Sequence, residues 1–240
     1  MAIKLLTLNI EADRHLARVG HMLTEHRPDI VCLQEVLEPD CERLAASGGY
    51  EVKYAVSGRV DMPGSECHWG VAVLSRLPVT RQIVSHYSED ASIRLLHKPN
   101  DARRVLLVTE LEHQGQPYRI ATTHFTWTPD GMINDEQKAD FIRLQRVLAG
   151  YPDYVLCGDF NAPRGAEMFG KFLAELNLID HLPANVTSTL DPQWHRLGNI
   201  ELVVDTIFST AHYQAIQTRV LEGISDHKGI MALIERRGSR

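Results

Sequence analysis

Apolar-rich runs alternate with helical patterns at both ends of the chain. Residues 3–8 (IKLLTL) and 30–33 (IVCL) have strand length, and such runs are typical of strands buried on both faces. Residues 12–26 repeat apolar side chains every three or four positions, and this spacing predicts an amphipathic helix. Pro28 then separates this helix from the second strand.

The middle of the chain has a different pattern, in which strand-like runs follow one another without helices. Glycine, proline and asparagine residues separate them. The predicted strands here are residues 51–56, 70–75, 80–86, 104–111 and 117–123. The other predicted elements are helices at 39–46, 134–149 and 166–176 and strands at 154–157, 200–208, 212–221 and 229–235. This order indicates sheets covered by helices, and the β-rich middle disfavours a plain doubly wound sheet.

Length and composition limit the class of protein. A chain of 240 residues, 44% of them hydrophobic, can bury one large core, so we expect one mixed α/β domain over residues 1–240. No apolar run reaches the ~20 residues needed to cross a bilayer, which predicts no membrane insertion. A buried first strand explains the opening MAIKLLTLNI better than a signal peptide does. The four scattered cysteines lack metal-ligand spacing. We therefore expect a cytoplasmic protein with reduced thiols, and no protein partner is implied.

The formal net charge is −6, which argues against broad electrostatic attraction to nucleic acid or anionic membranes. A local basic groove is still compatible with this charge.

Polar residues gather where the predicted strands end. They are Asn9 after the first strand, Glu35 after the second, His124 after 117–123, Asp159 and Asn161 after 154–157, Asp205 inside 200–208, and Asp226 and His227 before the last strand. Strand ends in layered α/β proteins bring side chains from distant sequence positions together.

Each of these residues alone has an ordinary structural explanation. A carboxylate after a strand commonly caps a helix or forms a turn, and a lone histidine is usually a hydrogen-bonded structural residue. Asp205 is the exception, because a carboxylate inside an apolar strand is costly unless it is paired or binds a metal. If the carboxylates converge, they need a cation, and oxygen ligands favour Mg²⁺ or Mn²⁺ over zinc. Phosphoryl chemistry is the reaction class that suits such a site.

This ordered set of motifs resembles the endonuclease/exonuclease/phosphatase superfamily. The motifs are TLN with Asn9, LQEV with Glu35, TTHF with His124, GDFN with Asp159 and Asn161, VVDTIF with Asp205, and SDH at 225–227. GVAVLSRLPV at 70–79 and Arg104 before LLVTEL also resemble family segments. The resemblance covers nearly the whole chain. It implies a four-layer α/β sandwich, with two packed mixed β-sheets flanked by helices, and phosphoester hydrolysis with Mg²⁺ (or Mn²⁺) as cofactor.

The resemblance also implies a role for each residue on the metal and water side of the site. Glu35, assisted by Asn9, would hold the metal on a non-bridging phosphate oxygen. Asp159 would orient and deprotonate the attacking water, and Asn161 would help to fix the phosphate or the nucleophile.

The histidines would act on the phosphate. The resemblance implies that His227 contacts the phosphate and stabilises the transition state, and that His124 is a second donor to the developing charge. Either Asp205 or Asp226 would orient His227. Similarity favours Asp205 near the site and Asp226 as an imidazole or metal partner.

The substrate is less defined by the sequence. LQEV with a TLNIE opening is more similar to the tyrosyl-DNA phosphodiesterase, deadenylase and sphingomyelinase-like branches than to the abasic-site endonucleases. Candidate substrate-binding residues are His68, Arg104, Trp127, Trp194 and Arg196. A tryptophan in these loops can stack on a base or simply pack the loop down, and separate arginines are ordinarily solvated.

Three function hypotheses follow. The first is a phosphodiesterase or nuclease acting on nucleic acid or its adducts, which a basic stripe at the site mouth would favour. The second is a phosphatase or phosphodiesterase for a small molecule, nucleotide or lipid head group, which a closed small pocket would favour. The third is a non-catalytic binding module, and the complete polar set argues against it.

Overall fold

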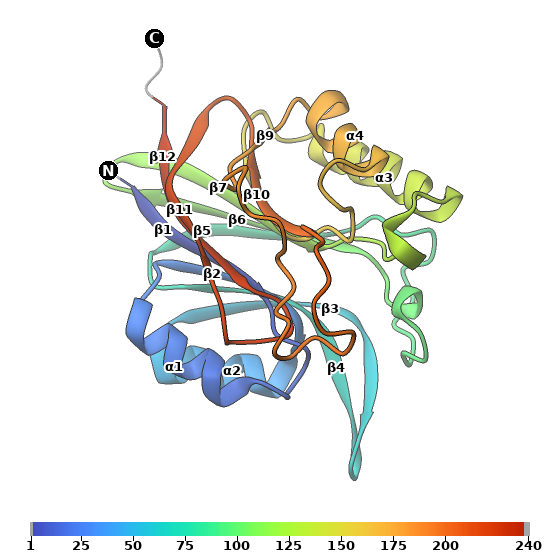
Figure 1. Cartoon of the computed structure of the whole chain (residues 1–240). Coiled ribbons are helices and arrows are strands. Elements are labelled where there is room, and N and C mark those ends of the chain that lie inside the picture. Colours follow the sequence, from blue (N-terminus) through green and yellow to red (C-terminus); the bar gives the residue numbers. More distant parts are fainter. Residues whose placement is uncertain (1, 238–240) are drawn as a thin grey trace.

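The apolar runs of the sequence form two six-stranded sheets that pack face to face (Figure 1). The computed structural model describes residues 2–237. The first sheet has the order β11 (Tyr213–Leu221), β12 (Gly229–Arg236), β1 (Ile3–Asn9), β2 (Ile30–Leu37), β4 (Ser65–Ser75) and β3 (Glu51–Met62). The second has the order β5 (Val79–His86), β6 (Val105–His113), β7 (Gln116–His124), β8 (Val155–Asp159), β10 (Asp205–Ser209) and β9 (Ile179–Asp180). Both sheets are mixed, because β1 pairs with β2 and β7 with β8 in parallel, while their other pairings are antiparallel.

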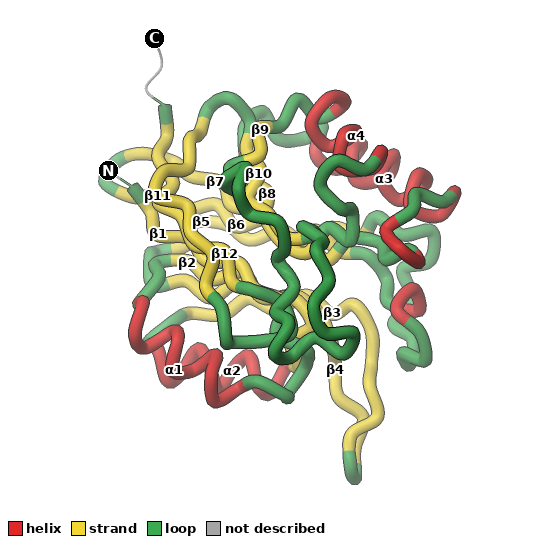
Figure 2. Tube along the Cα trace, viewed as in Figure 1, coloured by secondary structure: helices red, strands yellow, loops and turns green. Residues whose placement is uncertain are grey.

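Within residues 2–237, two α-helices cover the outer face of each sheet (Figures 1 and 2). The helices α1 (Leu16–His26) and α2 (Glu38–Gly48) bury their apolar faces against the first sheet. The helices α3 (Asp135–Leu148) and α4 (Glu167–Glu175) bury theirs against the second. Two short 3₁₀ helices, η1 (Pro99–Asp101) and η2 (Pro129–Gly131), lie in connecting loops. No helix of this part of the chain is long and apolar enough to span a bilayer. The predicted four-layer α/β sandwich is confirmed.

The inner faces of the two sheets form one apolar core. Side chains alternate between the two faces of a strand, so every second residue points into this core. The series is apolar at one end of the sandwich, where its members are Ile3, Leu5, Ile30, Cys32, Ile120, Val155 and Cys157. The same alternation continues toward the other end of the strands, where polar residues replace the apolar ones.

Two predicted elements begin later than expected. The strand predicted at 200–208 begins at Asp205, because residues 200–204 form a loop that is buried at Val203 and Val204 without pairing as a strand. The helix predicted from residue 12 begins at Leu16. Residues 11 and 12 instead form a turn with positive φ, in which the Ala12 N–H donates to the Glu35 carbonyl at 2.8 Å.

A polar cluster centred on Asp153 closes the apolar end of the sandwich. The Asp153 carboxylate accepts hydrogen bonds from Tyr213 Oη at 2.7 Å and from both terminal nitrogens of Arg236 at 3.0 Å. Arg119 donates to the Asp153 carbonyl at 2.6 Å. Tyr213 and Arg236 belong to the first sheet, whereas Arg119 on β7 belongs to the second. The cluster therefore joins the sheets at the end away from the strand-end motifs.

We expect Asp153→Asn to lower the free energy of unfolding by about 1–3 kcal/mol, because it leaves the partly buried Arg236 without its counter-charge, while Arg119 keeps Glu110 as a partner. Burial raises the pKa of Asp153, but Arg236, Tyr213 and Arg119 outweigh it and hold the pKa below its ordinary 3.8. A lowered pKa stabilises the fold above the unfolded-state pKa, and this stabilisation is lost as pH falls through the folded-state pKa. Urea unfolding should therefore separate the variant from the wild type at pH 7 and show a smaller difference at about pH 3. An equal difference at both pH values would contradict this account.

Candidate active site

The inward-facing positions become polar at one end of the sandwich. Along β1, Ile3 and Leu5 are followed by Thr7 and Asn9. Along β7 and β8 the last inward-facing residues are His124 and Asp159. Because β1, β2, β7 and β8 end at the same side and the antiparallel strand β10 begins there, the structure brings these motifs together, as their positions at strand ends led us to expect.

Asp159 lies at the centre of this group and is almost fully buried. Its Oδ2 accepts a hydrogen bond from Asn9 Nδ2 at 3.1 Å and lies 3.4 Å from His124 Nε2 and 3.8 Å from His227 Nε2. Burial and the nearby charge of Asp205 raise the pKa of Asp159 to about 7. A carboxylate with a pKa near neutral is suited to accept a proton from water.

His227 pairs with Asp205. The distance from His227 Nδ1 to Asp205 Oδ2 is 2.9 Å, and both side chains are buried. Asp205 stands opposite Asp159 in the antiparallel pairing of β10 with β8, and its backbone N–H donates to Thr189 Oγ1 at 3.1 Å. Burial lowers the pKa of His227, but the carboxylates of Asp205 and Asp159 outweigh burial and raise it well above its ordinary value. This environment favours the protonated form of His227.

Glu35 faces the same centre because β2 is irregular at this point. The pairing of β2 with β4 shifts register between Leu33 and Val36, and Glu35 has a φ of 54°. A bulge of this kind changes the direction of a side chain, and positive φ in a non-glycine residue is a mark of functional strain. Glu35 Oε1 accepts a hydrogen bond from Asn9 Nδ2 at 3.1 Å and lies 3.8 Å from His124 Nε2.

Asn9 links the carboxylates of Glu35 and Asp159 through its amide nitrogen. Its Nδ2 donates to both Glu35 and Asp159, while its Oδ1 accepts the Glu11 N–H at 3.2 Å. Asn9 thus supports the position of Glu35, in keeping with its expected assisting role, and the amide oxygen is engaged by the backbone.

Asn161 is held at the rim of the group. Its backbone N–H donates to Asp159 Oδ1 at 2.9 Å, its Nδ2 donates to the Phe125 carbonyl at 3.1 Å, and its φ is 47°. The side chain of Gln137 on α3 donates to the Asn161 carbonyl at 3.2 Å and to the Thr126 carbonyl at 2.9 Å. These bonds fix the loops that follow Asp159 and His124.

His124 packs between Trp69 and a buried arginine. The Trp69 ring centroid lies 5.5 Å from that of His124. Arg104, predicted as a substrate contact, is only 2% exposed, and its guanidinium donates to Asn100 Oδ1 and to the carbonyls of Pro99 and His124. Burial and the charge of Arg104 lower the pKa of His124 well below its ordinary value. Arg104 thus lies behind the histidine, and its charge adds to the larger effect of burial in favouring the neutral form of His124.

Asp226 lies in a second group, apart from the Asp205 and His227 pair. The ligand atoms of Glu11, His15 and Asp226 all lie within 4.8 Å of one another. His15 Nε2 is 3.0 Å from Glu11 Oε2. The charges of Asp226 and Glu11 contribute to the raised pKa of Glu35, after the larger effect of burial, which places this second group beside the metal side of the site.

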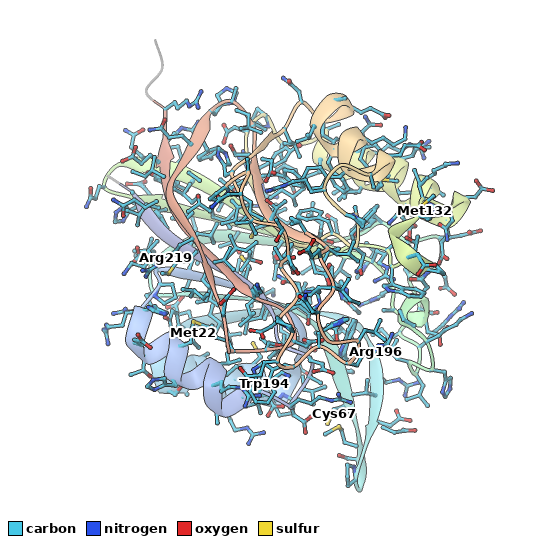
Figure 3. All side chains as sticks on the ribbon, in the orientation of Figure 1. Met22, Cys67, Met132, Trp194, Arg196 and Arg219 are labelled. Carbon is cyan, nitrogen blue, oxygen red and sulfur yellow. The ribbon has the colours of Figure 1, made fainter. Side chains whose placement is uncertain are left out.

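The other predicted substrate contacts have three kinds of surroundings. Trp127 is 36% exposed on the loop after β7, whereas His68 pairs with Glu38 at 2.8 Å. Trp194 packs against α1, because the Arg18 guanidinium lies 3.7 Å from its ring centroid. Arg196 is exposed on the same loop as Trp194, and Figure 3 shows both labels on the connection that crosses in front of the sheets. Trp127, His68 and Arg196 are accessible from solvent, and the ring face of Trp194 that Arg18 covers is not.

The residues present fit a divalent cation of the Mg²⁺ type. Glu35, Glu11 and Asp226 supply carboxylate oxygens on one side of the site, and such hard ligands suit Mg²⁺ or Mn²⁺. The buried group of Asp159, Asp205 and His227 also has its ligand atoms within 4.8 Å of one another. In that group the histidine already pairs with Asp205, so Glu35 is the carboxylate best placed to hold the metal.

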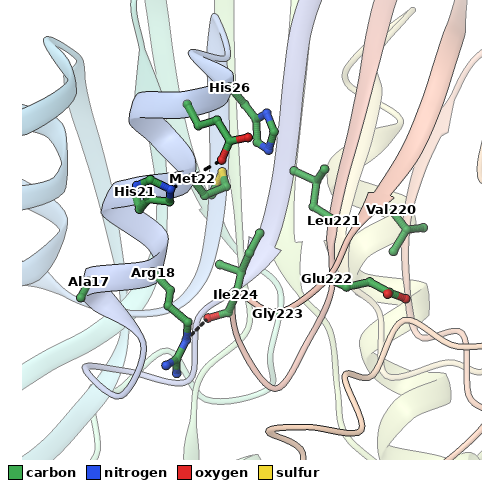
Figure 4. Close-up of a pocket in the computed structure, with 11 residues that line it drawn as sticks. Ala17, Arg18, His21, Met22, His26, Val220, Leu221, Glu222, Gly223 and Ile224 are labelled. Carbon is green, nitrogen blue, oxygen red and sulfur yellow. Dashed lines mark hydrogen bonds and ion pairs between the residues drawn. The ribbon is translucent and has the colours of Figure 1, made fainter.

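A groove of about 660 Å³ lies outside this site, between α1 and the connection from β11 to β12 (Figure 4). Its lining includes Arg18, His21, Met22, Leu221 and Ile224. Arg18 donates from Nε to the Ile224 carbonyl at 3.0 Å, a bond drawn in Figure 4. None of the residues predicted for catalysis lines this groove.

A model of the endonuclease/exonuclease/phosphatase family matches residues 6–227. The chain therefore belongs to this family, and the resemblance inferred from the motifs is confirmed. The match includes every motif residue from Asn9 to His227.

Curated and solved relatives extend the comparison. Phospholipase C of Staphylococcus aureus is 27% identical over 135 residues, which are 52% of this chain and 39% of that protein. The chain thus spans well under half the length of this relative. A family protein from Leptotrichia buccalis has a TM-score of 0.75 at 18% identity, covering 98% of this chain and 100% of that one. The human Nocturnin catalytic domain with bound sulfate has a TM-score of 0.70 at 20% identity, covering 98% of this chain and 94% of that one. TDP2 of D. rerio with a single-strand DNA product has a TM-score of 0.71 at 14% identity, covering 98% and 99%. At these identities the solved structures show the shared fold.

Sequence reasoning missed several residues that contact the site. Glu11 and His15 join Asp226, and the acidic residue directly after the first strand was a signal of the same kind as Glu35. Gln137 gave no signal, because an amide in an amphipathic helix is ordinarily a surface residue, yet here it is fully buried.

Proposed function

We propose that this protein is a Mg²⁺- or Mn²⁺-dependent phosphodiesterase that hydrolyses its substrate by in-line attack of water. The observation that carries the proposal is the continuous arrangement of His227, which pairs with Asp205, with Asp159, Asn9 and Glu35 across the ends of both sheets. It places a base, a cation and a metal-binding carboxylate around one position, which is what in-line displacement at phosphorus needs.

In this mechanism Asp159 accepts the proton of the attacking water. Asn161 fixes the loop beside it through its bonds to Asp159 and to the Phe125 carbonyl. When bound at Glu35, the metal supplies positive charge to a non-bridging phosphate oxygen. Asn9 holds the Glu35 carboxylate at the correct distance from Asp159.

The two histidines act in different charge states. His227 is held as a cation by Asp205 and stabilises the negative charge that develops on the phosphoryl oxygens. His124 is neutral and donates a single hydrogen bond to the same oxygens. The positive charge is thus concentrated on the side of the phosphate that faces Asp205.

A second candidate function is hydrolysis of a lipid head-group phosphodiester. The similarity to Phospholipase C of Staphylococcus aureus favours it. The likeness to TDP2 with bound single-strand DNA product supports the nucleic acid alternative. Both candidates use the same chemistry and differ only in the group attached to the phosphate.

A panel of phosphoesters, assayed after chelation and with Mg²⁺ or Mn²⁺ restored, tests the proposal. It contains single-stranded DNA, RNA, 5′-tyrosyl DNA, bis-p-nitrophenyl phosphate, phosphomonoesters and phosphocholine lipid vesicles. We expect at least one diester to be hydrolysed, with a loss of about 100-fold or more on metal removal. Glu35→Gln should abolish the metal response. Turnover that is unchanged by chelation, or no turnover of any substrate, would contradict the proposal.

A further inference from the structure

Gln34 is a fully buried polar residue inside the apolar core between the sheets. Its Nε2 lies 3.0 Å from Thr122 Oγ1 on β7 and 3.2 Å from Thr7 Oγ1 on β1. The carbonyl of Cys32 on its own strand lies at 3.3 Å. β1 and β2 belong to the first sheet and β7 to the second, so this one amide joins the two sheets.

Thr7 and Thr122, the two side-chain partners of Gln34, lie next to the active site on the side of the apolar core. Thr7 precedes Asn9 by two residues, and Thr122 precedes His124 by two residues. Residues two apart on a strand point to the same face. Each threonine therefore shares the inward-facing side of its strand with the active-site residue that follows it. Gln34 itself precedes Glu35, whose irregular backbone turns its carboxylate into the site.

The two halves of the site stand on different sheets. Asn9 and Glu35 belong to the first sheet, whereas His124 and Asp159 belong to the second. The core below them is apolar and closely packed, but it contributes no directional bond between the sheets. A buried hydrogen bond adds a contact with a preferred length and angle to this packing.

We propose that Gln34 is a positioning residue that, through its bond to Thr122, sets the distance between the two halves of the site. The metal half is Asn9 and Glu35 on the first sheet, and the water-activating half is Asp159 and His124 on the second. The bond to Thr7 stays within the first sheet and does not affect that distance. The expected effects on kcat and KM rest on the proposed function, whereas the expected effect on Mn²⁺ binding does not.

The matched pair Thr122→Val and Thr7→Val tests this directly. Both changes replace a buried hydroxyl by a methyl group of the same shape. Thr122→Val removes the contact of Gln34 with the second sheet, whereas Thr7→Val removes the contacts of Thr7 Oγ1 with Gln34 Nε2 at 3.2 Å and Oε1 at 3.5 Å, which stay within the first sheet. Each variant is measured by urea unfolding, by Mn²⁺ titration followed by electron paramagnetic resonance, and by kcat and KM on the best diester of the panel.

We expect the two variants to have similar urea midpoints. Thr122→Val should lower kcat about 10-fold and weaken Mn²⁺ binding several-fold, with substrate KM nearly unchanged, whereas Thr7→Val should stay within about twofold of the wild type. Gln34→Leu should lower kcat by about 10–100-fold. Tyr87→Phe removes a buried bond to Thr123 on the outer side of the same strand and should leave Mn²⁺ binding unchanged.

Equal effects of Thr122→Val and Thr7→Val on kcat and on Mn²⁺ affinity would overturn the proposal, and so would the absence of any effect of Thr122→Val. If the wild-type protein hydrolyses no diester, the proposed function fails, and the Mn²⁺ titrations still decide the role of Gln34. All four variants keep the sheets' apolar core, so the comparison does not depend on a single variant that fails to fold.

Discussion

Asp159→Asn is expected to lower kcat by at least about 100-fold while the protein keeps its fold. An amide cannot accept the proton of the attacking water, so the base of the proposed reaction is lost. An asparagine oxygen can still accept the Asn161 N–H that now bonds Asp159 Oδ1 at 2.9 Å, whereas the bond from Asn9 Nδ2 to Asp159 Oδ2 is lost. Steady-state kinetics on the best diester of the panel measures this change.

The stability of the same variant gives a second readout. Burial and the charge of Asp205 raise the pKa of Asp159, which means that its ionised form is destabilising in the folded metal-free protein. We therefore expect the metal-free variant to unfold at the same urea concentration as the wild type or at a higher one.

Asp153→Asn is the matched control, because Asp153 lies just before the same strand, β8, at its other end. It should lose stability and keep its kcat per folded molecule. Near-normal kcat in Asp159→Asn, or a large loss of kcat in folded Asp153→Asn, would refute this assignment of roles.

His227→Ala is expected to lower kcat by about 100-fold or more, because it removes the cation that faces the phosphate. It also leaves Asp205 buried without its partner, so some loss of stability should accompany it. Asp205→Asn should have a smaller effect of the same kind, since the histidine remains but loses the charge that holds its proton. The measurement is kcat/KM for both single variants and the double variant.

The double variant distinguishes direct from indirect action of Asp205. If Asp205 acts through His227, adding Asp205→Asn to His227→Ala should cost little further activity. An additional loss as large as in the wild-type background would show that Asp205 acts on the substrate independently. His181→Ala, at a partly buried histidine bonded to Ser209 away from the site group, is a control for removing a histidine and should keep kcat.

Much of the fold follows from local patterns. The apolar run of residues 30–33 and the helical spacing of 12–26 are decided by which side chains must leave water. Both patterns predicted the right type of element, although β2 continues to Leu37 and α1 begins only at Leu16. The predicted starts of the helix at residue 12 and of the strand at residue 200 were wrong for one shared reason. Their conformations are fixed by distant partners, namely the Glu35 carbonyl for Ala12 and the Thr189 hydroxyl for the chain at Val204.

The sequence by itself determined the order of the motifs, and with it the family and the set of polar residues that meet at one end of the sandwich. The tertiary structure alone decided how these residues pair. The sequence leaves both Asp205 and Asp226 as candidates to orient His227. Of the two, Asp205 bonds His227 in the structure, and the antiparallel register of β10 on β8 sets it opposite Asp159. Arg104 looks like a phosphate contact in the sequence and lies behind His124 in the fold. Asn9 and Asp159 are 150 residues apart. A strand's alternation specifies which face a side chain occupies, but the packing of one sheet on the other decides what it meets there.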